Sequence, residues 1–279
     1  GVDILVATPG RLLDLHQQQA VKFDEIEVLI LDEADRMLDM GFIRDIKRIL
    51  KLVPKQRQNL LFSATFSNEI RELAKTICRK PIEIDVAPRN STVKLISQKL
   101  YMIEQERKTE LLSAIVSSTS DQTLVFIRTK YGANNLVKKL RRNNISSVAI
   151  HGNRSQAQRT KALDAFKNDE VQVLVATDIA ARGIDIDQLE TVINFDLPQV
   201  PEDYVHRIGR TGRAGSSGNA ISLVSKEEKK QLRDIERVIK QPIPVADTAE
   251  FHFTMQSQKP SEKSSSDHRE REGQKPDER

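Results

Sequence analysis

Short runs of apolar residues recur along the chain, separated by longer segments in which apolar residues follow a helical period. This pattern is typical of parallel strands joined by crossover helices. The runs are apolar throughout rather than alternating, so we expect helices to cover both faces of the sheet. The predicted strands lie at residues 4–7, 28–31, 59–63, 82–86, 100–103, 123–127, 147–150, 171–176, 191–194 and 220–223.

Three segments show the helical period most clearly. They lie at residues 43–52, just before Pro54, at 68–78, and at 226–240. In the last of these, Leu232, Ile235 and Ile239 fall on one helical face. Strands and helices together predict an α/β fold.

The order of these elements predicts two doubly wound parallel-sheet units in tandem. We assign residues 1–86 to the first unit, 87–98 to a polar connector and 99–245 to the second unit. Residues 246–279 contain too few apolar side chains to bury, so we expect a disordered tail. Ligands of such folds bind at the carboxyl ends of the strands, which places a site between the units.

Composition narrows the possible environments. The 279 residues suit roughly two domains of about 150 residues each. The single cysteine, Cys78, rules out an internal disulfide framework, and no apolar run approaches the roughly 20 residues that span a bilayer. Nothing at the amino terminus resembles a signal peptide, so we expect a cytoplasmic protein. With 44 Lys and Arg against 40 Asp and Glu, the charge permits a polyanionic partner without demanding one.

Five polar clusters follow predicted strands. They are Ala7-Thr-Pro-Gly-Arg11, Asp32-Glu-Ala-Asp35, Ser63-Ala-Thr65, Thr177-Asp178 with Ala181-Arg-Gly-Ile-Asp185, and His206-Arg-Ile-Gly-Arg-Thr-Gly-Arg213. Most are weak signals alone, because Thr-Pro-Gly is a common turn and Ser-Ala-Thr can cap a helix.

The acidic cluster has two interpretations. It follows the aliphatic run 28–31, and three carboxylates there could simply form the solvated first turn of a helix, where the helix dipole favours them. Alternatively, a strand that delivers Asp32 and Glu33 to the carboxyl edge of a parallel sheet can place a magnesium ligand for phosphoryl transfer.

The basic cluster is the most specific. Three arginines and His206 are interleaved with Gly209, Gly212 and a threonine. So many cations need an anion, and phosphate suits the planar guanidinium group. A solvated basic loop is the alternative, but such a loop would not need the glycines, which let the backbone approach a ligand closely.

Together, in this order, the clusters resemble the DEAD-box family of ATP-dependent RNA helicases in superfamily 2. The resemblance covers residues 1 to about 245, and segments such as 6–14, 36–42 and 175–183 look most like the bacterial RhlE-type subgroup. It implies two RecA-like domains that use ATP and Mg²⁺.

The resemblance assigns catalytic roles to matching positions. Asp32 would hold Mg²⁺ through water and Glu33 would polarise the attacking water, while Arg210 would be the arginine finger, with Arg213 beside it. The resemblance further implies that the residues coupling hydrolysis to RNA are Asp35, Ser63, Thr65 and His206. It also implies that Gly183 and Asp185 lie near the phosphate and ribose of the nucleotide.

The resemblance also implies an RNA-binding rim that grips sugar and phosphate without reading sequence. Its residues would be Thr8, Gly10, Arg11, Arg128, Thr129, Gly152, Gln156, Arg159, Thr177 and Asp178. His151 lies next to this rim in the sequence. It could equally be a structural histidine at a strand end, with its hydrogen bonds made inside the protein. The implied substrates are single-stranded RNA and short RNA duplexes.

The chain departs from the family in its first domain, where the adenine-reading glutamine motif, the first RNA motifs and a phosphate-binding loop are all missing. Members carry a phosphate-binding loop that ends in Gly-Lys-Thr, and none of the 11 glycines here is followed by lysine. We therefore expect an amino-terminally truncated first domain with an uncovered apolar face, and little ATP hydrolysis by this chain alone. The alternative is a naturally short, non-catalytic module that binds RNA or docks a partner; the reading frame before Gly1 would distinguish the two. We expect a monomer with partners in ribosome assembly or RNA turnover, and no membrane association.

Overall fold

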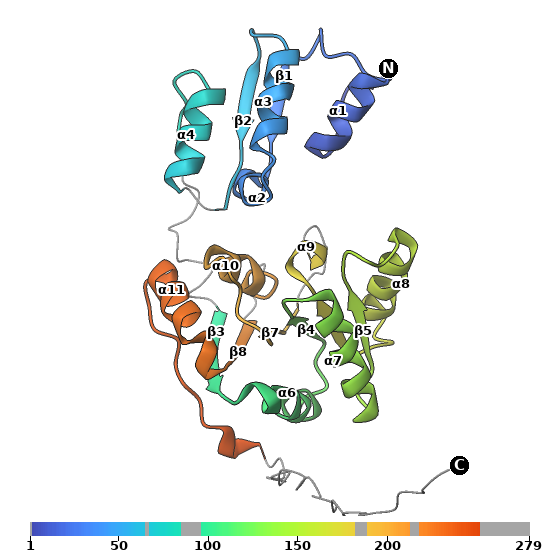
Figure 1. Ribbon diagram of the computed structural model, residues 1–279, viewed down its shortest axis with the longest axis vertical. Helices are drawn as coiled ribbons and strands as arrows, with labels where there is room; N and C mark the ends of the chain where they lie inside the picture. Colours follow the sequence, from blue (N-terminus) through green and yellow to red (C-terminus); the bar gives the residue numbers. More distant parts are fainter. Residues whose placement is uncertain (1, 65–66, 85–95, 182–188, 213–217, 252–279) are drawn as a thin grey trace, which may run out of the picture.

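The structure is a computed structural model that describes residues 2–64, 67–84, 96–181, 189–212 and 218–251. It contains two α/β units, each built on a parallel sheet (Figure 1). The predicted fold class is confirmed.

The first unit contains a small parallel sheet and four helices. Strand β1 (Val28–Leu31) pairs with β2 (Gln58–Leu61) in parallel, so that Val28 lies beside Gln58 and Leu31 beside Leu61. The helices are α1 (Pro9–Gln17), α2 (Ala34–Asp39), α3 (Ile43–Leu52) and α4 (Asn68–Ile77). A buried core of Leu31, Ile46, Leu73 and Ile77 holds the sheet against them.

Two predicted strands of this unit are wrong. Residues 4–7 have no regular structure, and Ile4 and Val6 are 82% and 91% exposed. Residues 82–84 are also irregular, with Ile82 88% exposed, and 85 and 86 lie outside the described residues. An apolar run forms a stable strand only when it pairs with a neighbour and buries a face, and neither segment pairs with a described strand.

One face of the small sheet is uncovered. Val28, Ile30 and Phe62 are 46%, 55% and 53% exposed. The prediction of helices on both faces is therefore wrong for the described part of this unit, whereas the expectation of an uncovered apolar face is confirmed.

The second unit contains a six-stranded parallel sheet in the order β3-β8-β7-β4-β6-β5. Its strands are β3 (Ile96–Met102), β4 (Thr123–Phe126), β5 (Ser147–Ile150), β6 (Val173–Ala176), β7 (Thr191–Asn194) and β8 (Gly218–Val224). Its helices are α6 (Lys108–Ser117), α7 (Lys130–Arg142), α8 (Gln156–Lys167), α9 (Asp178–Ala181), α10 (Glu202–Ile208) and α11 (Lys229–Ile239). Single 3₁₀ turns occupy η1 (Gln105–Arg107), η2 (Lys226–Glu228) and η3 (Thr248–Glu250).

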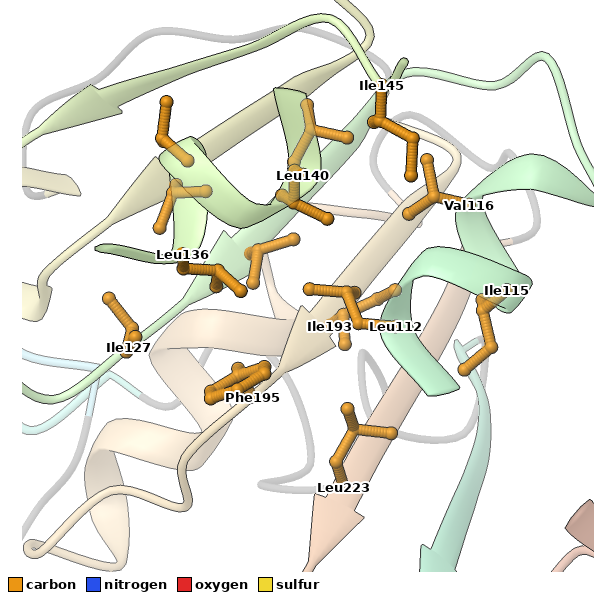
Figure 2. Close-up of a cluster of buried hydrophobic side chains, with 14 of the residues drawn as sticks. Leu112, Ile115, Val116, Ile127, Leu136, Leu140, Ile145, Ile193, Phe195 and Leu223 are labelled. Carbon is orange, nitrogen blue, oxygen red and sulfur yellow. The ribbon is translucent and has the colours of Figure 1, made fainter. Parts of the chain in front are cut away.

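Helices cover both faces of this sheet, as the unbroken apolar strands predicted. Figure 2 shows Leu112 and Val116 of α6, with Leu136 and Leu140 of α7, around Ile193 of β7. The opposite face is covered by α8 near one edge and by α10 and α11 near the other. Strands β4, β6 and β7 are buried along their whole length.

The ends of the second unit differ from the prediction. Strand β3 begins at Ile96, inside the predicted connector, because its pairing with β8 starts there. Residues 246–251, predicted as the start of the tail, are packed: the Ala246 N–H donates to the Leu100 carbonyl at 2.8 Å, and Phe251 makes an edge contact with Tyr101. This segment covers part of the exposed edge of β3 and so protects it from non-native pairing.

Candidate functional site

The acidic cluster forms the turn between β1 and α2. Glu33 lies in the left-handed region at φ 51°, and its N–H donates to Asp32 Oδ1 at 2.9 Å. A left-handed conformation costs a non-glycine residue about 1–2 kcal/mol. The turn is tied to the end of β2, because the Ala34 N–H donates to the Phe62 carbonyl at 3.0 Å. Two exposed carboxylates are thereby held at the carboxyl edge of the small sheet.

Asp35 and Arg36, which follow Ala34, contact the second unit. Asp35 and Arg36 are 6% and 7% exposed. Asp35 Oδ2 lies 3.4 Å from His206 Nε2, and Arg36 forms an ion pair with Asp203. Both partners belong to α10, which lies below α2 in Figure 1. The acidic and basic clusters are thus in direct contact although they lie in different units.

Arg207, which the sequence reasoning did not single out, organises the base of the basic cluster. It is 2% exposed, and its Nε and Nη2 donate to the two carboxylate oxygens of Asp178 at 2.6 and 2.8 Å. Its Nη1 donates to Asn194 Oδ1 at 3.0 Å and to the Asp196 carbonyl at 2.6 Å. Its guanidinium also lies 5.0 Å from the centre of the Phe126 ring. Both oxygens of Asp178 therefore already have a cationic partner within the protein.

The rest of the basic cluster follows α10. A Cβ on Gly209 would lie 3.1 Å from the Val205 carbonyl, and Gly212 has φ +67°. Thr211 is buried, and its hydroxyl contacts the carbonyls of Leu189 and Glu190, just before β7. The glycines thus meet a backbone requirement, and Arg210 follows Gly209, the residue that ends α10.

Most of the predicted RNA-binding residues of the second unit lie at one edge of its sheet. Arg128 and Thr129 follow β4, Gly152 follows β5, and Thr177 follows β6, and these strands are neighbours. Parallel strands end at the same edge, so these residues share it.

Helix α8 contributes two further predicted RNA-binding residues. Arg159 Nη1 donates to Gln156 Oε1 at 3.3 Å, and Nη2 donates to the Ala180 carbonyl at 3.3 Å. The contact with Ala180 joins the first turn of α8 to α9, which begins at the predicted RNA residue Asp178.

The predicted RNA-binding residues of the first unit lie at the start of α1. Thr8 is the residue before the helix, Gly10 and Arg11 lie in its first turn, and all three are exposed. Arg11 forms an ion pair with Asp14 in the next turn.

A buried ionic cluster supports Arg128, and the sequence reasoning missed it. Lys108 is fully buried, donates to the Phe195 carbonyl at 2.8 Å and forms an ion pair with Glu228. Arg128 Nη2 lies 3.8 Å from Glu228 Oε1 and 3.9 Å from Asp196 Oδ1. A lysine at a helix start gives no sequence signal for burial, because such residues are usually exposed.

Four predicted site residues, Thr65, Gly183, Asp185 and Arg213, lie outside the described residues. Ser63 is described and lies two residues after the end of β2. Among the described residues, no three His, Cys, Asp or Glu side chains are grouped so that they could hold a metal ion. Within the same ranges, every helix is too short or too polar to span a membrane.

Comparison with known proteins identifies the family. Residues 1–73 match the DEAD/DEAH box helicase model, and residues 106–215 match the helicase conserved C-terminal domain. The ATP-dependent RNA helicase DeaD of Buchnera aphidicola is 42% identical over 244 residues, which are 88% of this chain and 41% of that protein. RhlB of Pseudomonas putida is 43% identical over 210 residues, with 74% of this chain and 53% of that protein covered. The chain spans about half the length of the curated relatives it matches.

The chain also resembles solved structures of the protein Dbp5. Dbp5 of S. cerevisiae bound to RNA and ADP BeF3 matches with a TM-score of 0.80 at 34% identity, covering 88% of this chain and 66% of that one. A Dbp5 variant bound to a Gle1 variant and IP6 matches with a TM-score of only 0.65, at 33% identity and with 87% and 64% covered. The two family models match the two units in order, and the acidic and basic clusters of those units meet across α2 and α10. The chain belongs to the DEAD-box family of RNA helicases.

Proposed function

We propose that this chain supplies the catalytic carboxylates, the arginine finger and the RNA grip of an ATP-dependent RNA helicase. Such a helicase hydrolyses ATP when RNA is bound and separates short duplexes or remodels RNA–protein complexes. The observation that carries the proposal is the contact between α2 and α10, where Asp35 lies 3.4 Å from His206 and Arg36 pairs with Asp203. Through this contact, ATP hydrolysis at the acidic cluster of the first unit would change the position of α10 in the second unit.

The arrangement of the units supports closure as the mechanism. The chain is more similar to Dbp5 with RNA and ADP BeF3 than to the Dbp5 variant with Gle1 and IP6. We infer that ATP and RNA together stabilise this arrangement, which brings Arg210 to the γ-phosphate. An arginine finger supplied in this way accelerates hydrolysis by about 10³–10⁵. Arg213, Gly183 and Asp185 would complete the nucleotide site from the same unit.

The acidic turn fits Mg²⁺ bound through water. Asp32 is exposed at the carboxyl edge of the sheet, and no cluster of three ligands surrounds it among the described residues. Mg²⁺ usually keeps several waters and takes only one or two carboxylates plus substrate phosphates, so a single exposed carboxylate suits it. When bound, the ion neutralises charge on the phosphates. Glu33, held next to Asp32 by the left-handed turn, would accept the proton of the attacking water.

RNA would bind across the carboxyl edge of the second sheet and the start of α1. Arg128 and Arg159 supply charge there, and Thr8, Thr129 and Thr177 supply hydroxyls, so the contacts would go to phosphate and sugar. Asp178 would act through Arg207, which occupies both of its oxygens. Ser63 and Thr65 would relay between the nucleotide and RNA sites. Backbone contacts of this kind do not read sequence. We further propose a cytoplasmic location and partners in ribosome assembly or RNA turnover. The RhlE-type subgroup remains a prediction.

A reconstitution experiment separates this proposal from a non-catalytic RNA-binding module. The chain contains no Gly-Lys-Thr segment, so we expect no ATP hydrolysis above that of an Arg210→Ala control when it is assayed alone with RNA. Adding a segment of a relative that carries Gly-Lys-Thr, with co-elution as proof of assembly, should restore RNA-stimulated hydrolysis. Glu33→Gln and Arg210→Ala should each abolish it. A co-eluting complex that shows no hydrolysis would instead support the non-catalytic module.

A further inference from the structure

A cavity of about 910 Å³ lies at the edge of the second sheet, beside β5. Helices α7 and α8 lie on either side of β5 (Figure 1) and pack on opposite faces of the sheet. Residues of both helices line the cavity. The volume lies within the roughly 300–1,000 Å³ range of typical ligand sites. We call this cavity the edge groove; its lining includes Tyr131, Lys138, Arg141, His151, Arg154 and Lys161.

The edge groove is strongly cationic. Four exposed Lys and Arg side chains line it, and no Asp or Glu among the described residues does. Each helix contributes: Lys138 and Arg141 come from α7, and Lys161 comes from α8. Charges of one sign along both walls of a cleft focus the potential and attract an anionic ligand.

A buried acceptor also lacks a partner there. His151 is 2% exposed, and its Nε2 lies 3.1 Å from Asn134 Oδ1, which also accepts from Arg154 Nη2 at 3.1 Å. The Arg154 guanidinium can only donate, so the Asn134 atom that it contacts is the amide oxygen, which can only accept. Nε2 of His151 must therefore carry the ring proton, and Nδ1 is left as the acceptor. Nδ1 has no hydrogen-bond partner among the described residues. Burial, with Arg154 and Lys130 nearby, lowers the pKa of His151 and keeps the ring neutral.

These features point to one ligand chemistry. The cations suit phosphate, and the unpaired Nδ1 needs a donor such as a hydroxyl, because an unsatisfied buried acceptor costs about 1–3 kcal/mol. Tyr131 is 77% exposed at the same cavity and offers a ring face on which a base can stack. Phosphate, hydroxyl and base together describe a ribonucleotide strand.

We propose that the edge groove binds the backbone of an RNA segment that flanks the strand held at the carboxyl edge of the second sheet. His151 would accept from a ribose 2′-hydroxyl, and Lys138, Arg154 and Lys161 would contact phosphates. The inference rests on the proposed RNA binding and extends it to residues outside the family motifs. Continuity supports it, because His151 lies directly before Gly152, and Arg154 lies two residues before the first turn of α8.

Binding of short and long RNA by the full chain tests this inference. Fluorescence anisotropy would measure labelled oligouridylates of about 6 and about 16 nucleotides, within the range of single-strand site sizes. The test variant is Lys138→Glu with Lys161→Glu. The matched control is Arg142→Glu with Lys167→Glu, which reverses two exposed cations of the same helices that lie outside the groove lining.

We expect the test variant to lose at least about tenfold in affinity for the long strand and nothing for the short one. Loss of two phosphate contacts should also lower the slope of log affinity against log salt by about 1.4 for the long strand. The control should match the wild type. A His151→Phe variant should reduce the preference for RNA over DNA of the same sequence with the long strand only, because DNA lacks the 2′-hydroxyl and the short strand does not reach the groove.

Three results would overturn the inference, and a fourth would overturn the proposed function as well. The groove is not an RNA site if the test variant binds the long strand as the control does, or if His151→Phe prefers the long RNA over DNA as strongly as the wild type does. Polyglutamate serves as a second probe: if the test variant loses polyglutamate binding while its RNA binding is intact, the ligand is an acidic protein instead. If the wild-type chain binds neither strand, the proposed function itself fails.

Discussion

Replacement of Arg207 by methionine should destabilise the second unit by about 3–5 kcal/mol. The side chain is 2% exposed and donates four hydrogen bonds, two to Asp178, one to Asn194 and one to the Asp196 carbonyl. Charge-assisted bonds contribute about 1.5–3 kcal/mol each but are not additive. Removal of one partner from a buried ion pair typically costs about 3–5 kcal/mol, which sets the expected loss.

Urea unfolding followed by far-ultraviolet circular dichroism measures this loss. At an m-value of about 2 kcal/mol/M, the midpoint should fall by about 1.5–2.5 M. The matched control is Arg237→Met, because Arg237 is 79% exposed and pairs with Asp234 on the helix surface. An exposed pair contributes at most about 1 kcal/mol. If the midpoint of Arg207→Met falls no further than that of the control, the Arg207 network does not stabilise the unit as described.

The remaining predictions concern the junction, the buried histidine and a glycine. Arg36→Ala should weaken association of the two units, seen as faster proteolysis between them, and the effects of Arg36→Ala and Asp203→Ala should sum to more than that of the double variant, because the two residues form an ion pair. The lowered pKa of His151 means that its stabilising contribution is complete above the unfolded pKa of about 6.5 and is lost as pH falls through the lower folded pKa. The urea midpoint should therefore drop between pH 7.5 and 5.5, and drop less in His151→Phe. Gly218→Ala should destabilise, because its Cβ would lie 2.5 Å from the Gly212 nitrogen, whereas Gly10→Ala, with nothing within 4 Å, should raise stability by about 1 kcal/mol. Equal midpoints for the two alanine variants would contradict this.

The strands of the second unit could be predicted because they are buried on both faces and carry an unbroken apolar signal. Strand β3 shows where the apolar signal fails to mark the start of a strand. Its polar residues Gln98 and Lys99 hid its true start at Ile96, which depends on pairing with β8. Residues 4–7 show the opposite error, because an apolar run without a paired neighbour does not form a strand.

The site was predictable as motifs but not as contacts. The acidic and basic clusters are visible in the sequence, yet nothing in either cluster indicates that Arg36 pairs with Asp203. Burial of Lys108 against Glu228 was equally hidden, because the two residues are far apart in the chain and each is usually exposed. Such pairs depend on how the units and helices pack, which local pattern does not record.

The affinity of this chain for RNA strands of unrelated sequence tests the central claim most directly. Binding of equally long RNA strands, and of their DNA counterparts, would be measured for the wild type and for Arg159→Ala. We predict RNA affinities that differ little between sequences, weaker binding of DNA, and a loss in Arg159→Ala that is uniform across sequences because its contact is to the backbone. Strong preference for one sequence, or equal binding of RNA and DNA, would contradict recognition through the RNA backbone.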